Sequence, residues 1–277
     1  MGYEKLLDPL SEIRESCEAL LSGEYGSLTG DARESVKNIY AGTGGLYALF
    51  VDIITSLGIE NTARRAFLQD KFQDMFSLII PSSKALLDEM DGPLSEEQEV
   101  SVMFIYETGE TLRRHVESIW LYSRLHLHHV KVNKTRVDIS RLAKNLELPE
   151  MNRVVKSTIF SDETPPTAVT DEKLLRRCLQ ELIDNAAKFS TDGMIIVHCR
   201  LVQTAPVIDV IDTGKGVTTL WVERLFEPFF QEDSNAEGIG LGLTIANQIA
   251  RLLRGRIELT DSRSGIGSTF SLFLPAA

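Results

Sequence analysis

The sequence has few of the features that mark secreted or membrane-spanning proteins. Only three of its 277 residues are cysteine, at positions 17, 178 and 199, and they lie far apart in apolar surroundings. This spacing argues against a disulfide framework or a zinc site and favours three buried thiols in a reducing compartment. The chain has no run of about 18 apolar residues and no N-terminal basic region followed by an apolar stretch. We therefore expect a cytoplasmic chain without a membrane segment or secretion signal of its own.

Positive charge is also scarce. The chain has 29 Lys and Arg against 40 Asp and Glu, a formal net charge of −11. Nucleic-acid binding needs clustered Lys and Arg that release counterions from phosphates, so this balance argues against nucleic acid as a main partner. With 43% hydrophobic and 25% charged residues, the composition is that of a folded globular protein, and the length favours two domains.

The first half has the apolar periodicity of helices. From residue 3 to about 129 apolar positions recur every three or four residues, which predicts four long helices in a bundle. Glycine turns at 23–26 and 91–93 separate them, with Thr29 and Ser95 as N-caps and Gln98 completing a capping box with Ser95. Gly58 and Asn61–Thr62 join the second and third helices. The predicted seams are Leu6, Leu10, Ile13, Cys17 and Leu20; Val36, Tyr40, Thr43, Tyr47, Phe50, Ile54 and Leu57; Leu68, Phe72, Met75, Ile79 and Leu86; and Ile105, Gly109, Leu112, Val116 and Ile119.

The helical half repeats itself at an offset of 66 residues. The stretch EKLLDP at 4–9 corresponds to DKFQDM at 70–75, and the match continues through Gly26 and Gly92 and through Ile39-Tyr40 and Ile105-Tyr106. Shared helical periodicity can supply coincidences of Leu and Ile. It does not readily supply the glycine turn, the N-caps and the Lys-x-x-Asp step in one register. The repeat predicts two tandem helical hairpins, at residues 1–60 and 61–132.

The second half, residues 133–277, changes to short β-branched or apolar runs between helical stretches. Strands are predicted at 194–202, 206–211, 256–260 and 268–274, and helices at 171–189 and 241–253. The pattern indicates an α/β sandwich with one sheet covered by helices on one face. The predicted fold class is thus α+β, an all-α four-helix bundle followed by this sandwich, with the boundary near 131–138.

Four clusters in the second half have residue types suited to nucleotide chemistry. Glu181, Asn185 and Lys188 lie on a predicted helix where residues four apart share a face, and together they suit a hydrated Mg²⁺ and phosphates. A solvated polar stripe would explain this cluster taken alone. Asp212 ends a buried strand before Gly214 and Gly216, where an acid can accept from an exocyclic amine, although a plain tight turn fits equally well.

The other two clusters are glycine-rich. Gly238, Gly240 and Gly242 lead directly into a helix, whose free amides form an anion site. This cluster does not fit the dinucleotide fingerprint, because the preceding strand and the later acid are missing. The fourth cluster, GIGSTF at 265–270, includes Thr269 and by itself is a hairpin turn.

In this order and spacing the four clusters resemble the ATP-binding domain of the gyrase, chaperone and histidine-kinase superfamily. LFEPFF at 225–230 is similar to the phenylalanine box of sensor histidine kinases, and GPLS at 92–95 and LYSRL at 121–125 are similar to their dimerisation and phosphotransfer hairpin. The resemblance implies ATP and Mg²⁺ as cofactors, with Asn185 on Mg²⁺, Lys188 toward phosphate, Asp212 on the adenine amine and Thr269 near the adenine end. Gly214, Gly216, Gly238, Gly240 and Gly242 would shape the pocket and its lid.

The chain departs from this family at the phosphate-accepting histidine. The resemblance places that histidine five residues before a proline; Pro9 then puts Glu4 there, and the second copy has Asp70. An alternative register through Pro81 puts Phe76 there. None of these side chains has the neutral imidazole nitrogen that forms a phosphoramidate. The five histidines are elsewhere, at 115, 126, 128, 129 and 198, where a half-buried structural role for the first and a surface helix cap for the next three explain them better than a metal site.

The lid and the general base also bear on catalysis. The segment 231–237 contains no basic residue, where active kinases of this type usually have a cation near the γ-phosphate; Lys188 or Lys215 would have to replace it. Glu181 stands where hydrolysing members of the superfamily have a catalytic general base, so slow ATP hydrolysis is chemically possible.

The hypothesis that follows is a degenerate histidine kinase, an ATP-binding two-component signalling protein that does not autophosphorylate and acts by binding partners. The expected partners are a response regulator or a sensor kinase, and two hairpins in one chain predict a monomer or a weak dimer. The first alternative is an active kinase that phosphorylates a histidine in trans or at a non-standard position. The second is a histidine phosphotransfer protein, for which His115 is the candidate.

Overall fold

The structure is a computed structural model that describes residues 4–55, 62–146, 155–161, 166–190, 193–232 and 238–276. The chain divides into two compact units, Met1–Glu117 and Ser118–Ala277, and the division falls within a long helix. Among the described residues no helix is both long and apolar enough to cross a bilayer. The two units are described separately below.

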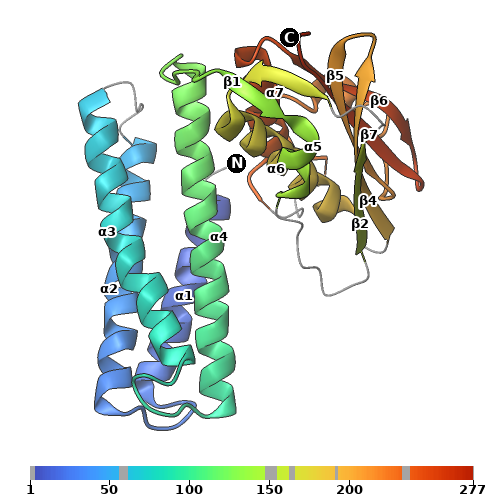
Figure 1. The fold of residues 1–277 in the computed structure, drawn as a ribbon. Coiled ribbons are helices and arrows are strands. Elements are labelled where there is room, and N and C mark those ends of the chain that lie inside the picture. Colours follow the sequence, from blue (N-terminus) through green and yellow to red (C-terminus); the bar gives the residue numbers. More distant parts are fainter. Residues whose placement is uncertain are drawn as a thin grey trace. The chain divides into compact units, whose positions relative to one another are not determined.

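The first unit contains the four predicted helices: α1 (Glu4–Ser22), α2 (Gly30–Thr55), α3 (Thr62–Leu87) and α4 (Glu96–His126), the last of which ends in the second unit (Figure 1). The seam predicted for α1 is fully buried, from Leu6 to Leu20. Helix α2 packs closely on both α1 and α3. Most of the α2–α3 join lies outside the described residues.

The seam of α2 differs from the predicted one. Tyr47 is 41% exposed and Tyr40 is half-buried, whereas Ile39 and Leu46 are fully buried. The phenol of Tyr40 instead accepts from Arg14 (2.6 Å) and donates to Glu18 (2.9 Å) on α1. Two neighbouring sets of positions on α2 satisfy a spacing of three and four residues. The set with Ile39 and Leu46 is buried, because a buried tyrosine phenol needs a polar partner and an aliphatic side chain does not. In α3, Phe76 is likewise buried while its neighbour Met75 is half-buried.

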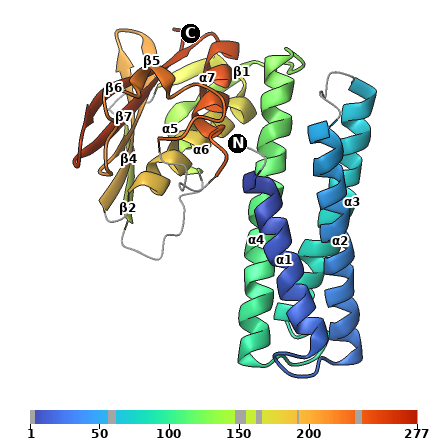
Figure 2. The ribbon, with the colours of Figure 1, turned by 180° about the vertical axis from the view of Figure 1, so that it is seen from behind.

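The two hairpin turns have the same backbone, residue for residue, at the offset of 66. Gly23 and Glu89 have φ of 84° and 53°, and Gly26 and Gly92 have φ of 101° and 106°. The amide of Gly26 donates to the Gly23 carbonyl (3.0 Å), and the amide of Gly92 donates to the Glu89 carbonyl (3.2 Å). Both turns lie at the same end of the bundle, as the view from behind also shows (Figure 2).

The N-caps link these two turns reciprocally. Thr29 caps α2 by accepting from the Ala32 amide (3.1 Å), and Ser95 and Gln98 form the predicted capping box on α4. In addition, the Thr29 hydroxyl donates to the Asp91 carbonyl (2.5 Å), and the Ser95 hydroxyl donates to the Tyr25 carbonyl (3.2 Å). Equivalent groups of the two copies thus bind each other, as across a two-fold axis.

The second unit is the α/β part. Its five-stranded sheet has the order β2-β4-β5-β7-β6, and only the β2–β4 pair is parallel. The strands are β2 (Val155–Ser161), β4 (Gly193–Val202), β5 (Ala205–Asp212), β6 (Arg256–Arg263) and β7 (Gly267–Phe273). Helices α6 (Glu172–Phe189) and α7 (Gly242–Leu252) pack against each other and against this sheet.

The sequence prediction of a single sheet is wrong in one respect. A second sheet of two antiparallel strands pairs β1 (Thr135–Asp138) with β3 (Thr167–Thr170), and helix α5 (Ile139–Lys144) follows β1. β1, β3 and α5 were not predicted, because four-residue strands and a six-residue helix are too short for a periodic signal. The seven-residue β2 was not predicted either. A 3₁₀ turn, η1 (Val222–Arg224), precedes the phenylalanine-rich segment.

Candidate functional site

Helix α6 is the central element of the candidate site. It begins at an N-cap, Asp171, whose side chain accepts from the Leu174 amide (3.1 Å) and from the Asn133 amide (2.7 Å). Its apolar face is buried, and Glu181, Asn185 and Lys188 follow one another along the remaining surface toward its C-terminal end. A capped helix with one buried face gives these three side chains a fixed order along the site.

Glu181 is held by an ion pair that the sequence analysis missed. Its carboxylate lies 2.5 Å from the Arg177 guanidinium, and its side chain is only 11% exposed. Burial raises the pKa of Glu181, while Arg177 opposes that shift. Arg177 stands four residues before Glu181 on the same helix, so the i, i+4 rule could have identified it.

The same carboxylate faces the start of α7. A Cβ added to Gly242, the first residue of α7, would lie 2.9 Å from the second carboxylate oxygen of Glu181. The absence of a side chain at Gly242 therefore leaves room for this carboxylate next to the free amides of a helix start. Two of the predicted clusters, on α6 and before α7, are brought together here.

Asp212 is the last residue of β5 and is 6% exposed. Its carboxylate accepts from the Gly214 amide (2.8 Å). Burial raises the pKa of Asp212, and the amides of Gly214 and Ser268 oppose the shift. A buried carboxylate at a strand end, kept in place by backbone donors, is suited to accept one further hydrogen bond from a ligand amine.

The residue of β7 beside Asp212 is Ser268, not Thr269. In the β5–β7 register Asp212 pairs with Ser268, and Thr269 pairs with Ile211. Successive side chains of a strand point to opposite faces, so the buried Ser268 shares the face of Asp212, and Thr269 lies on the other face. The strand register, which the sequence analysis did not establish, is what distinguishes the two neighbours.

The loop after β5 closes against the end of α6. The amide of Lys215 donates to the Phe189 carbonyl (3.3 Å), and a Cβ on Gly214 would collide with the same carbonyl. Gly216 packs instead on the backbone of Arg263, at the turn that leads to β7. Asp212, Gly214 and Lys188 are thereby gathered around the C-terminal end of α6.

The glycine-rich segment before α7 is bound to the phenylalanine box. The Phe229 amide donates to the Gly240 carbonyl (2.9 Å), the Gln231 side chain donates to the Gly238 carbonyl (3.0 Å), and the Thr244 hydroxyl donates to the Phe226 carbonyl (3.2 Å). Gly240 has a φ of 73°, and a Cβ there would lie 2.7 Å from the Phe230 carbonyl oxygen, so glycine is required. Gly238 and Gly240 thus form one wall of the site together with residues 226–231.

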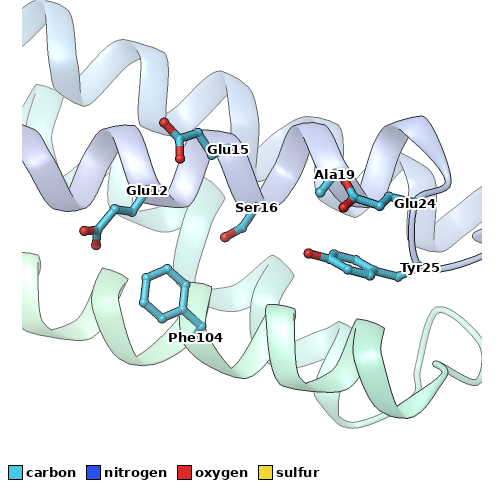
Figure 3. A pocket seen from close by; sticks show the side chains of 7 residues that line it. All are labelled: Glu12, Glu15, Ser16, Ala19, Glu24, Tyr25 and Phe104. Atoms are coloured by element: carbon cyan, nitrogen blue, oxygen red, sulfur yellow. The ribbon is translucent and has the colours of Figure 1, made fainter.

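A separate surface groove of about 410 Å³ lies on the helical unit, between α1 and α4. Figure 3 shows Phe104 of α4 and Tyr25 between the two helices, with carboxylates of Glu12, Glu15 and Glu24 nearby. None of the predicted site residues lines this groove.

The three cysteines are buried and unpaired, and burial raises the pKa of Cys17 and Cys199 to about 12, so these thiols remain protonated.

Comparison with known proteins agrees with this geometry. The family profile described as "Histidine kinase-, DNA gyrase B-, and HSP90-like ATPase" matches residues 170–277. The autoinducer 2 sensor kinase/phosphatase LuxQ of Vibrio harveyi is 28% identical over 212 residues, which cover 71% of this chain and 24% of that protein. The adaptive-response sensory kinase SasA of Crocosphaera subtropica is 32% identical over 201 residues, covering 68% of this chain and 52% of that protein.

Solved structures show the same fold. Full-length ShkA in complex with AMPPNP superposes with a TM-score of 0.66 at 26% sequence identity, covering 78% of this chain and 46% of that one. The Acinetobacter baumannii histidine kinase AdeS matches in fold, with a TM-score of 0.53 at 21% identity over 73% of this chain and 95% of that one. This chain spans only about a quarter of LuxQ and about half of SasA. It belongs to the sensor histidine kinase family, and residues 170–277 are its histidine kinase-type ATPase region.

Proposed function

We propose that this chain is a two-component signalling protein that binds ATP with Mg²⁺, does not phosphorylate itself, and acts by binding a response regulator or a sensor kinase. The observation that carries this proposal is that neither of the two positions expected to hold the phosphate-accepting histidine holds a histidine. Glu4 begins α1, and Asp70 is exposed on α3. A carboxylate does not form a phosphoramidate, because that bond needs an imidazole nitrogen as nucleophile.

The residues of the candidate site fit the nucleotide. The carboxamide oxygen of Asn185 would ligate Mg²⁺, a hard cation that prefers oxygen, and Lys188 would approach the phosphates. Asp212 would accept from the adenine amine, with the Ser268 hydroxyl on the same face of the sheet. The free amides at the start of α7 would accept negative charge. When bound, Mg²⁺ would neutralise phosphate charge.

Catalysis is the least supported part of the site. Glu181 stands where a general base would act on water, and its raised pKa is suited to that role. Its carboxylate is however paired with Arg177 at 2.5 Å. We therefore propose slow hydrolysis at most, with nucleotide binding as the main property of the site.

Calorimetric titration with ATP and Mg²⁺ tests the pocket. We expect the wild type to bind and Asn185→Asp and Asp212→Asn to lose most of their affinity, because each changes a charge or acceptor at the nucleotide. Asp261→Asn is the matched control, since Asp261 is exposed and pairs with Arg263 at 3.7 Å on β6. Absence of heat with the wild type would refute nucleotide binding, and unchanged affinity in the two site variants would refute the roles proposed for Asn185 and Asp212.

Incubation with γ-labelled ATP separates the pseudokinase from the active kinase. The intact arrangement around α6 favours the active kinase as the second candidate. We expect no acid-labile label on the chain, and label retained there would overturn the proposal. A phosphotransfer role would depend on His115, which is half-buried on α4 and is less accessible than such chemistry requires.

We also propose that residues 1–60 and 61–132 are two copies of one hairpin that together form an intramolecular bundle, followed by the nucleotide-binding domain at 133–277. The reciprocal bonds of Thr29 and Ser95 support this arrangement. Light scattering after size exclusion should give a monomer. A tight dimer would contradict this part of the proposal alone.

A further inference from the structure

Lys215, in the loop after β5, forms an ion pair with Glu232. Its ammonium nitrogen lies 2.7 Å from a carboxylate oxygen of Glu232. The other oxygen of Glu232 accepts from the Thr218 hydroxyl (3.2 Å). Both charged side chains are partly exposed, so the pair lies at the surface of the molecule and not in its core. It joins the loop after β5 to the residues that follow the phenylalanine box at 225–230.

Lys215 belongs to the nucleotide site by position. Its amide is bonded to the Phe189 carbonyl, and it follows Asp212 by three residues. The ammonium groups of Lys188 and Lys215 lie 4.9 and 5.0 Å from the centroid of the Phe189 ring. Two cations therefore approach one aromatic ring at the end of the helix that presents Asn185.

The surrounding charge explains why Lys215 would matter. A nucleoside triphosphate is an anion, and the segment from Gln231 to Glu237 has three acids and no Lys or Arg. A phosphate oxygen bound to Lys215 would take the place that the Glu232 carboxylate oxygen occupies, because the two groups present similar negative oxygens to an ammonium.

We propose that Lys215 is a phosphate-binding residue of the nucleotide site and that Glu232 occupies it until a nucleotide displaces the carboxylate. The inference rests on the nucleotide binding proposed above and adds an internal competitor to it. Nucleotide binding would then release the Glu232 side chain from Lys215 and Thr218.

Titration calorimetry of the full chain with MgATP, MgADP and adenosine tests this inference. Glu232→Gln should bind MgATP and MgADP about three to ten times more tightly than the wild type, because a partly exposed ion pair no longer competes. Lys215→Gln should bind both about ten times more weakly. The double variant should bind both nucleotides as weakly as Lys215→Gln, because Glu232 can compete with phosphate only when Lys215 is present.

Adenosine and Glu258→Gln are the controls. Adenosine has no phosphate, so its affinity should be equal in all variants. Glu258 pairs with Arg256 at 2.6 Å on β6 and is not among the residues of the candidate site, so its variant should bind MgATP like the wild type. Equal MgATP affinity of Glu232→Gln and wild type, or an adenosine shift as large as the MgATP shift, would overturn the inference while leaving nucleotide binding intact. A wild type that binds no nucleotide would refute the proposed function itself.

Discussion

The two hairpins of the helical unit have nearly the same turns but different outer surfaces. At the turns, the φ angles, the hydrogen bonds and the N-caps agree position by position. On the outer face of α2, Glu34 and Lys37 form a solvated pair (3.6 Å) beside Asn38. The equivalent residues of α4 are Val100, Met103 and Phe104, which are 71%, 41% and 39% exposed. A duplicated scaffold needs matching turns and seams to pack, whereas its solvated faces are free to diverge.

The copies also differ in the position at which their second helices approach α3. On α2, a Cβ at Gly42 would lie 2.9 Å from the Ile79 side chain and 3.0 Å from the Met75 carbonyl oxygen. The equivalent position of α4 is Thr108, which is half-buried. On α4 the glycine is the next residue, Gly109, where a Cβ would lie 3.1 Å from the same Ile79 side chain. The bundle is symmetric at its turns and asymmetric along its length.

The largest expected effect is the gain of a nucleophile. Replacing Glu4 and Asp70 with histidine supplies an imidazole at both equivalent positions, and we expect acid-labile label from γ-labelled ATP where the wild type takes up none. The single variants Glu4→His and Asp70→His compare the two copies directly. If neither single nor double variant is labelled while ATP still binds, the copies have lost more than the nucleophile.

The next effect concerns the close approach of α2 to α3. Gly42→Val should lower the free energy of unfolding by about 2 to 3 kcal/mol, because the added methyl groups collide with Ile79 and the Met75 backbone. Thr108→Val at the equivalent position of α4 should change it by less than about 1 kcal/mol. Urea unfolding followed by circular dichroism measures both. Equal losses would show that the two helices are packed alike.

The paired N-caps should have smaller and similar effects. Thr29→Ala and Ser95→Ala each remove a cap and one bond to the opposite turn, and each should cost about 1 to 2 kcal/mol. Because each hydroxyl binds the opposite turn, we expect the double variant to be measurably non-additive. Costs that differ strongly, or one near zero, would contradict the two-fold relation of the turns.

The smallest effect is at the turn position where the copies differ in residue. Glu89 has a positive φ of 53°, and Gly23 is its equivalent in the first copy. Glu89→Gly should stabilise the protein by about 0.5 to 1 kcal/mol because glycine adopts this conformation without strain, and Gly23→Glu should destabilise it by a similar amount. Thermal unfolding should show shifts of opposite sign. Shifts of the same sign would mean that the two turns are not equivalent.

Much of the helical unit was predictable because its signals are local. The N-caps at Thr29 and Ser95, the capping box with Gln98 and the glycine turns depend on neighbouring residues, and each was found as predicted. The seam of α2 was wrong because two registers satisfy the same spacing, and the choice between Tyr40 and Ile39 depends on what the other helices place opposite. The short elements β1, β3 and α5 were not predicted, because they contain too few residues for a periodic pattern of apolar positions.

By itself the sequence determined the two-part organisation, the repeat, the family resemblance and the residue types of the candidate site, because composition, periodicity and motif order are written along the chain. Only the tertiary structure decided that Ser268 and not Thr269 lies beside Asp212 and that Glu232 meets Lys215. Strand pairing and loop closure bring together residues far apart in sequence, and a one-residue change of register reverses the face on which a side chain lies.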